Sequence, residues 1–223
     1  MTSHKVEDYL KAIYELEEAE GLAKTTLLAE KLGIQAGTVS EMIKRLSKGS
    51  PRLITYKHHH GVRLTLKGKK TALGVIRRHR LLETFLHQTL GLSWDEVHKE
   101  AEVLEHHLSE RVTDSIDRHL DFPKFDPHGE PIPDKEGNIV SPAQINLSDI
   151  HERQIFKIIA VNPVSSELLL YLESLGIGIH SSGSVISKSP LDGPIKIRIN
   201  QKGVFREHTL GRNVTDQIYV ERI

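Results

Sequence analysis

Apolar residues recur every three or four positions through the opening stretch VEDYLKAIYELEEAEG. This spacing lines them up on one face of a helix, so an amphipathic helix is predicted from Val6 to the glycine at position 21. The pattern then divides into a short helix at residues 25–32, a turn at Gly33 and a second helix that opens near Gly37 and Thr38. Two short helices joined by a tight glycine turn indicate a helix-turn-helix.

Strand-like and helical patterns alternate after the second of these helices. The stretch LITYKHHHGVRLTLKGKK predicts two short strands around a turn at His60–Gly61, the wing of a winged helix. A long helix is predicted over residues 71–91. In SWDE, Ser93 and Glu96 have the spacing of a capping box. The helix that they open is expected to run without interruption to about Leu120.

The last third of the chain has a different composition. Residues 121–144, DFPKFDPHGEPIPDKEGNIVSPAQ, are rich in proline and predict a linker or an extended wrap. From Asn146 onward, the runs KIIAVN, GSVISK, IKIRIN and QIYVERI predict a small all-β module, interrupted by one helical turn at SSELLLYLESLG. The predicted fold class is therefore mainly α with a small β domain.

Composition narrows the possible chemistry. The 223 residues include no cysteine, so disulfides and thiolate chemistry are excluded, and any metal must be held by oxygen and nitrogen atoms. No apolar run approaches 20 residues, and no basic-then-apolar leader opens the chain. We therefore expect a cytoplasmic protein without a membrane segment.

The formal net charge of zero conceals a polarised chain. Residues 1–80 carry 16 positive and 8 negative charges, residues 81–150 carry 5 and 15, and residues 151–223 carry 9 and 7. Within residues 35–80 the only acidic residue is Glu41, against 12 basic residues. A basic first section favours a polyanion partner, and an acidic middle favours cations.

A helix-turn-helix with a basic wing is typical of DNA binding, because the second helix enters the major groove and the wing contacts phosphates. The alternative is a winged helix used for protein contacts. The candidate base-reading residues are Gln35, Thr38, Ser40 and Glu41. The candidate phosphate contacts are Lys44, Arg45, Arg52, Lys57, Arg63, Lys67, Lys69 and Lys70. The histidines at 58–60 are interpreted as phosphate contacts or exposed residues, although a metal cluster is an alternative.

Histidines and carboxylates recur on the middle helices. On an uninterrupted helix, His98, Glu102, Glu105 and His106 would share one face. On the preceding helix, His79 and Glu83 are four residues apart. If the two helices pack antiparallel, the six side chains would meet, and mixed imidazole and carboxylate ligands suit Mn²⁺, Fe²⁺ or Zn²⁺. The alternative is an ordinary solvated face.

Together, VEDYLKAIYEL, the helix-turn-helix, GVRLTLKGKK, RRHRLLETFL, VHKEAEVLEHHLSE and PHGEPIP resemble the diphtheria-toxin-repressor and manganese-transport-regulator family of metal-activated transcriptional repressors. The resemblance covers the whole chain in the family's long layout. It implies a winged-helix DNA-binding domain over residues 1–72, a helical metal-binding and dimerisation domain with the linker over 73–142, and an SH3-like β-barrel of the FeoA type over 143–223.

The resemblance also implies the metal ligands. A primary site would use Asp8, Glu102, Glu105 and His106. An ancillary site would use His79, Glu83 and His98, with Asp126 and Glu167 as further ligands.

Departures from the family pattern bear on the choice of metal. The iron-responsive branch has methionine and cysteine at positions 8 and 102, so Asp8 and Glu102 favour Mn²⁺. Lys11 stands where some manganese regulators have glutamate, which puts a closely bridged pair of manganese ions in doubt.

The implied function is a Mn²⁺-activated repressor that binds a palindromic DNA operator as a homodimer and controls metal-uptake genes. An iron-responsive repressor, a winged-helix regulator with a purely structural metal, and a metalloenzyme are the alternatives. Against an enzyme, the chain has no HExxH motif and no Glu-x-x-His pair. The sequence leaves open whether the C-terminal module braces the ancillary site, binds the linker or contributes to the dimer.

Overall fold

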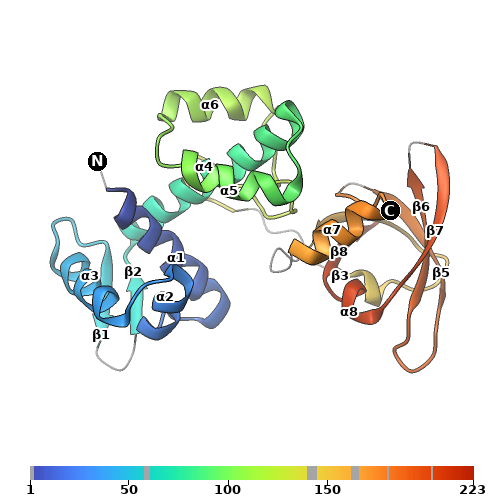
Figure 1. Cartoon of the computed structure of the whole chain (residues 1–223), viewed down its shortest axis with the longest axis horizontal. Helices are drawn as coiled ribbons and strands as arrows, with labels where there is room; N and C mark the ends of the chain where they lie inside the picture. The colour runs from blue at the N-terminus through green and yellow to red at the C-terminus, as the bar shows by residue number, and fades with distance from the viewer. Residues whose placement is uncertain (1–2, 58–60, 140–144, 162–165, 180, 202) are drawn as a thin grey trace. The chain divides into compact units, whose positions relative to one another are not determined.

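The computed structural model describes residues 3–57, 61–139, 145–161, 166–179, 181–201 and 203–223 (Figure 1). The chain forms two compact units. The first contains Met1–His79, Glu102–Asp114 and Pro133–Ile139, and the second contains Arg80–Ala101, Ser115–Ile132 and Val140–Ile223. None of the helices described is long and apolar enough to cross a membrane.

The first unit begins with the predicted winged helix. Its helices are α1 (His4–Glu20), α2 (Thr25–Leu32) and α3 (Ala36–Lys48), followed by the antiparallel strands β1 (Ile54–Lys57) and β2 (Gly61–Leu64). Figure 1 shows these elements in blue to turquoise, with the three helices packed together beside the hairpin. Gly21 and Gly33 end α1 and α2 in the left-handed conformation, which glycine adopts without strain. The predicted helices and wing strands are confirmed, while His60, in the predicted turn, lies outside the described residues.

The apolar positions that predicted these helices form the core of the winged helix. Leu10, Ile13, Leu28 and Ile43 are buried in one cluster, together with Ile54 of the wing. Burial of such side chains contributes about 1.5–3 kcal/mol each. The helix-turn-helix is therefore held on α1, the helix that also carries Asp8 and Lys11.

Helix α4 (Leu66–Leu90) begins five residues before the predicted start at residue 71. Thr65 provides the start signal, because its hydroxyl accepts a hydrogen bond from the Gly68 amide at 3.1 Å and its carbonyl accepts one from Lys69. Gly68 is required here, since a Cβ atom at this position would overlap the carbonyl of Leu53.

The predicted uninterrupted helix from Ser93 to Leu120 is wrong. The structure has α5 (Trp94–Leu104), a turn, and α6 (Glu110–His119). The capping box is confirmed, because the Ser93 amide donates to Glu96 at 3.0 Å. Ser109 was the overlooked signal. Its hydroxyl accepts from the Val112 amide at 3.3 Å and starts a new helix. Glu105 and His106 therefore lie in a turn, not on the helical face that carries His98.

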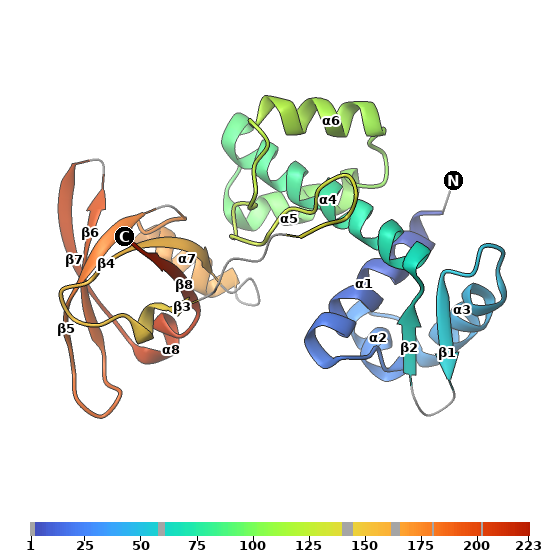
Figure 2. The same cartoon turned by 180° about the vertical axis from the view of Figure 1, so that it is seen from behind.

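The second unit contains the C-terminal module, whose antiparallel sheet has the strand order β3-β8-β4-β5-β6-β7. The strands are β3 (Ile145–Asn146), β4 (Ile155–Val161), β5 (Ser182–Lys188), β6 (Ile195–Gln201), β7 (Val204–Leu210) and β8 (Ile218–Arg222), with the short helices η1 (Leu147–Asp149), α7 (Ser166–Ser174) and α8 (Arg212–Thr215). Figure 2 shows the sheet curling beside α7 and α8.

The curvature of this sheet has a local cause. Register shifts interrupt the ladder between Ile158 and Ala160 and between Val185 and Ser187, and such bulges bend strands. The four predicted strands are confirmed. Strands β3 and β7 and helix α8 were not predicted, and the helix predicted as a single turn is the nine-residue α7.

The described part of the proline-rich segment is an ordered wrap. In the first unit, Lys135 contacts Asp114 of α6 at 2.6 Å, and Ile139 packs on the winged-helix core. In the second unit, the amide of Val161 in β4 donates to the carbonyl of His128 at 3.0 Å. The segment thus carries its own polar residues into defined positions.

Candidate metal centre

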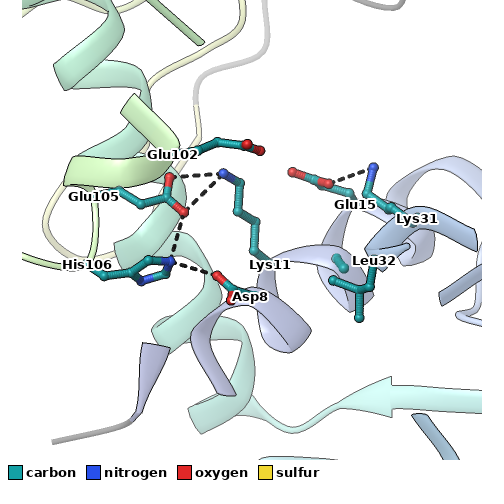
Figure 3. Close-up of a pocket in the computed structure, with 9 residues that line it drawn as sticks. Asp8, Lys11, Glu15, Lys31, Leu32, Glu102, Glu105 and His106 are labelled. Carbon is teal, nitrogen blue, oxygen red and sulfur yellow. Dashed lines mark hydrogen bonds and ion pairs between the residues drawn. The ribbon is translucent and has the colours of Figure 1, made fainter. Parts of the chain in front are cut away.

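A cluster of ligand-type side chains in the first unit joins α1 to the turn after α5 (Figure 3). The Nε2 atom of His106 lies 2.7 Å from Oδ1 of Asp8 and 3.4 Å from Oε1 of Glu105. Asp8 comes from the first turns of α1, whereas Glu105 and His106 follow directly after α5. Ending α5 at Leu104 lets these two consecutive residues both face α1.

Glu105 is the buried centre of this cluster, with 2% of its side chain exposed. Lys11 donates to its two carboxylate oxygens at 3.0 and 3.2 Å, and Nδ1 of His79 lies 2.5 Å from Oε2. Burial alone would raise the pKa of Glu105, but the His79 hydrogen bond and the Lys11 charge together hold it below its usual range. The carboxylate is therefore ionised and ready to bind a cation.

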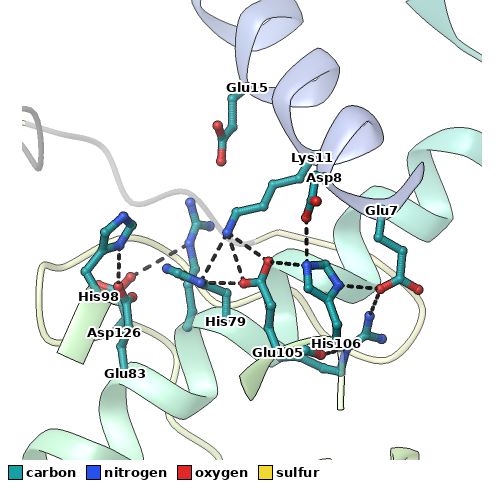
Figure 4. A network of polar contacts seen from close by, with 12 residues as sticks. Glu7, Asp8, Lys11, Glu15, His79, Glu83, His98, Glu105, His106 and Asp126 are labelled. Atoms are coloured by element: carbon teal, nitrogen blue, oxygen red, sulfur yellow. Dashed lines mark hydrogen bonds and ion pairs between the residues drawn. The ribbon is translucent and has the colours of Figure 1, made fainter. Parts of the chain in front are cut away.

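A second carboxylate fixes the ring of His106. Oε2 of Glu7 lies 2.8 Å from Nδ1 of His106, and Arg78 holds the same oxygen at 3.0 Å (Figure 4). Both ring nitrogens of His106 therefore face carboxylates. With an ion at Nε2, the ring proton would sit on Nδ1 and be held by Glu7. Arg78 also donates to the Glu105 carbonyl at 2.7 Å, which fixes the turn.

Glu102 lies on the open side of the cluster. Its side chain is exposed and lines a pocket of about 410 Å³ with Asp8, Glu105 and His106. The same pocket is lined by Lys11, Ala12, Glu15, Lys31 and Leu32. Solvent and a cation therefore have a path to all four of the residues predicted for the primary site.

The donor atoms suit a divalent ion. Ligand atoms of Asp8, Glu105 and His106 lie within 4.8 Å of one another. Neighbouring ligands of an octahedral ion with bonds of about 2.1 Å are about 3 Å apart, close to the 2.7 and 3.4 Å separations from His106. Two carboxylates and one imidazole, with Glu102 lining the same pocket, match the preference of Mn²⁺, Fe²⁺ and Zn²⁺.

A second polar group lies within the second unit and was only partly predicted. Nδ1 of His98 is 3.0 Å from Oε1 of Glu83, and Nε2 of His128 is 3.6 Å from the same oxygen. Glu83 and His128 are buried, while His98 is half exposed. Burial alone would lower the pKa of His128, but contact with Glu83 raises it above the usual value. His79, predicted for this group, lies one helical turn before Glu83 on α4.

Asp126 is buried beside this second group. Its Oδ1 accepts hydrogen bonds from the amides of His128 and Glu130, and its Oδ2 accepts none from the described residues. Burial and the nearby carboxylates of Glu83 and Glu130 raise the pKa of Asp126 to about 7. Arg80 offsets part of this repulsion, 3.7 Å from Oδ2 of Asp126. A divalent ion bound here would relieve the repulsion between the carboxylates.

Glu167 and His128 differ from what the sequence predicted. Glu167 is exposed on α7, and neither of the metal-ligand groups found among the described residues includes it. His128 lies in the PHGEPIP loop and was not predicted as a ligand. Its position two residues after Asp126, a predicted ligand, could have marked it as a candidate ligand.

Residues predicted to contact DNA are mostly exposed on α3 and the wing. Val39, Ile43 and Leu46 anchor α3 in the core. The exposed candidates are Gln35, Thr38, Glu41, Lys44, Arg45, Arg52, Lys57, Arg63, Lys67, Lys69 and Lys70. Ser40 differs from them, because it is half-buried and its hydroxyl donates to the Ala36 carbonyl at 2.9 Å. Lys69 turns back over the ring of Tyr14.

Each of the three parts of the chain matches a known protein family. Residues 1–62 match the N-terminal DNA-binding domain of iron-dependent repressors, residues 65–134 their metal-binding and dimerisation domain, and residues 145–222 the FeoA domain. These matches agree with the winged helix, the helical region and the SH3-like antiparallel sheet module.

Characterised relatives agree with the family models. The chain is 38% identical over 127 residues to the iron-dependent repressor IdeR of Mycobacterium leprae, covering 57% of this chain and 54% of that protein. It is 37% identical over 125 residues to the transcriptional regulator MntR of Bacillus pumilus, covering 56% of this chain and 83% of that protein.

Solved structures of similar proteins extend the likeness over the whole chain. A manganese-dependent transcriptional repressor in complex with manganese has a TM-score of 0.80 at 36% identity, covering 98% of this chain and 100% of that chain. The manganese regulator SloR has a TM-score of 0.66 at 33% identity, with 98% of each chain covered. With the winged helix and the carboxylate–imidazole centre, these findings show that the chain belongs to the iron-dependent repressor family, which consists of metal-dependent transcriptional repressors and not of enzymes.

Proposed function

We propose that this repressor is activated by Mn²⁺, which binds Asp8, Glu102, Glu105 and His106. The observation that carries the proposal is the 2.7 Å approach of His106 to Asp8, which brings α1 to the turn after α5. An ion held by both segments restrains the helix on which the helix-turn-helix is packed. Because a ligand shifts an equilibrium only by preferring one state, this bridge provides a reason for metal to favour the DNA-binding state.

The ligand set supports Mn²⁺ as the physiological ion. Three carboxylates and one imidazole form a hard, oxygen-rich set, and the chain has no cysteine to favour softer ions. Some similar proteins are named as manganese-dependent regulators, and others as iron-dependent repressors. An iron-responsive repressor of the same family is therefore the second candidate.

The DNA partner is a palindromic operator, bound by a homodimer in the cytoplasm, and the regulated genes encode metal uptake. Two recognition helices of a dimer must match half-sites about one turn of DNA apart, roughly 34 Å or a multiple. The exposed Gln35, which precedes α3, and Thr38 in its first turn read base edges, while Lys44, Arg45, Lys57 and Arg63 contact phosphates. Restraining α1 would fix the spacing of the two α3 helices on the operator.

An ancillary ion is proposed for the second group, held by Glu83, His98, Asp126 and His128. The buried carboxylates of Glu83 and Asp126 support it, because two such groups repel each other without a cation. His79 stays a candidate ligand through its position on α4, whereas Glu167 has only the family resemblance in its support.

Operator binding at buffered free metal concentrations tests this function. We expect Mn²⁺ to promote a gel shift by the wild-type protein, and Asp8→Ala to weaken the Mn²⁺-dependent complex more than about tenfold, since one ligand and the bridge are lost. Glu15→Gln is the matched control, because Glu15 lines the same pocket but pairs with Lys31 at 2.9 Å. An unchanged response of Asp8→Ala would contradict the bridge, and activation by Zn²⁺ alone would contradict the choice of Mn²⁺.

Chelation separates regulation from a purely structural metal. In the first unit, Lys11, His79 and His106 already contact Glu105, so the centre has internal partners without an ion. We therefore expect a chelator to release DNA while circular dichroism stays that of a folded protein. Unfolding on chelation would favour the structural alternative.

A further inference from the structure

The side chain of Lys11 enters the metal centre instead of extending into solvent. Its Nζ atom lies 3.0 and 3.2 Å from the two oxygens of Glu105 and 3.1 Å from Nδ1 of His79. Only 14% of the side chain is exposed. Three ligand-type atoms therefore surround one ammonium group, as they would surround a bound cation (Figure 4).

Glu105 lies between two places where a positive charge can be held, one beside Asp8 and His106 and the other at Lys11. Its Oε1 faces His106 at 3.4 Å, on the side of Asp8, while both oxygens also contact Lys11. A carboxylate placed between two positive positions is the arrangement of two-metal sites, whose ions lie about 3.5–4 Å apart. In this chain one of the two positions is taken by an amino group that is covalently part of α1.

Charge counting leads to the same conclusion. Asp8, Glu102 and Glu105 contribute three negative charges, and metal-binding histidines are neutral. Glu7 is balanced separately by Arg78. Lys11 reduces the net charge of the centre from −3 to −2, which one divalent ion neutralises.

We propose that Lys11 is a tethered cation that limits the primary centre to one divalent ion. This inference rests on the proposed primary site and specifies its capacity. Lys11 neutralises the buried Glu105 in the metal-free protein and excludes a second ion by occupying its position and by repulsion. Lys11 is thus a residue that determines the stoichiometry of the centre.

Titration of the full-length metal-free protein with Mn²⁺ tests the proposal, with calorimetry to count ions and electron paramagnetic resonance to detect pairs. Lys11→Glu raises the negative charge of the centre to −4, which matches two divalent ions. We expect it to bind one more Mn²⁺ per chain than the wild type, with a spin-coupled signal that the wild type lacks. Lys31→Glu is the control, because Lys31 lines the same pocket, undergoes the same charge change and pairs with Glu15, not Glu105.

Lys11→Gln provides a second readout that does not depend on the number of ions. Without the ammonium, Glu105 loses a buried partner, so the metal-free variant should melt at a lower temperature than the wild type. Mn²⁺ should then raise its melting temperature by a larger increment than it does for the wild type, because no fixed cation opposes the ion. This comparison decides the matter if Lys11→Glu fails to fold.

The outcomes separate this inference from the proposed function. A spin-coupled manganese pair in the wild type, or a folded Lys11→Glu variant with wild-type stoichiometry, would overturn the inference and leave the metal-activated repressor intact. Melting of Lys11→Gln identical to the wild type, with and without Mn²⁺, would also overturn it. A wild-type protein that binds no Mn²⁺ at all would instead contradict the proposed function.

Discussion

His106 shows how single residues prepare the centre for a metal. Its two ring nitrogens have different partners, Glu7 at Nδ1 and Asp8 at Nε2. Because Arg78 also holds Glu7, the imidazole is oriented by a chain of charged groups. Such outer partners fix the tautomer of a ligand and raise its basicity. Glu7 was not predicted from the sequence, because no local pattern places it beside a histidine almost a hundred positions away.

At the residue scale, we expect Glu7→Gln to weaken Mn²⁺ binding by about 10–100-fold, because the ring of His106 loses its negatively charged partner. Glu18→Gln, on the exposed face of the same helix, should bind Mn²⁺ as the wild type does. Isothermal titration with Mn²⁺ gives both affinities. Equal affinities for the two variants would show that Glu7 does not position His106.

The loop of residues 126–130 shows how an element carries ligands. Hydrogen bonds from the amides of His128 and Glu130 to Asp126 shape this loop, and the His128 carbonyl pairs with the Val161 amide of β4. Gly129 has φ +84° and packs so closely on β4 that a Cβ atom would overlap Ala160. The loop therefore links the second polar group to the C-terminal module within one unit. We therefore propose that the module braces the ancillary group, one of the roles that the sequence left open.

At the element scale, Gly129→Ala should displace the loop from β4 and weaken binding of the ancillary ion. Gly203→Ala is a close control, because φ is +91° but nothing lies within 4 Å of the added Cβ. Both variants pay about 1–2 kcal/mol for the left-handed backbone. Only Gly129→Ala should add an overlap penalty of about 1–3 kcal/mol.

Thermal melting and Mn²⁺ titration measure these two effects. We expect Gly129→Ala to melt well below Gly203→Ala and to lose affinity at one class of Mn²⁺ site. If the two glycine variants melt together and bind Mn²⁺ alike, contact between loop and β4 does not support the ancillary group.

At the scale of the whole molecule, the basic and acidic residues are concentrated in different parts of the chain. The basic residues of positions 35–80 surround α3 and the wing, while the acidic middle section supplies two of the three residues in each metal-ligand group. A chain of zero formal charge can thus attract DNA with one part and divalent ions with another.

Salt dependence tests this division. Lys44→Ala should weaken binding to all DNA sequences to a similar extent and reduce the slope of log K against log salt by about 0.9, because one phosphate contact is lost. Lys196→Ala should leave the slope unchanged, since Lys196 is in the C-terminal module and pairs with Glu207 at 2.8 Å. An unchanged slope for Lys44→Ala would remove Lys44 from the DNA contacts.

The sequence by itself determined the elements whose signals are local. Apolar spacing and the glycines at 21 and 33 predicted α1 and α2, and Ser93 with Glu96 predicted the start of α5. Local reading failed where two signals competed. Helical periodicity continued through Glu105 and His106, but the cap at Ser109 ended that helix and began another. Helical periodicity could not identify Asp8 as a ligand or divide the ligands into two sites. Both of these predictions came from the family resemblance.

Only the tertiary structure decided what each ligand contacts. Residues 8 and 106 are nearly a hundred positions apart, and no local pattern shows that Glu7 orients His106 or that Lys11 reaches Glu105. His128 is buried beside Glu83 because the proline-rich segment returns to α4. Periodicity shows which face of a helix a side chain occupies, whereas contact across the chain depends on packing between segments, which no single segment encodes.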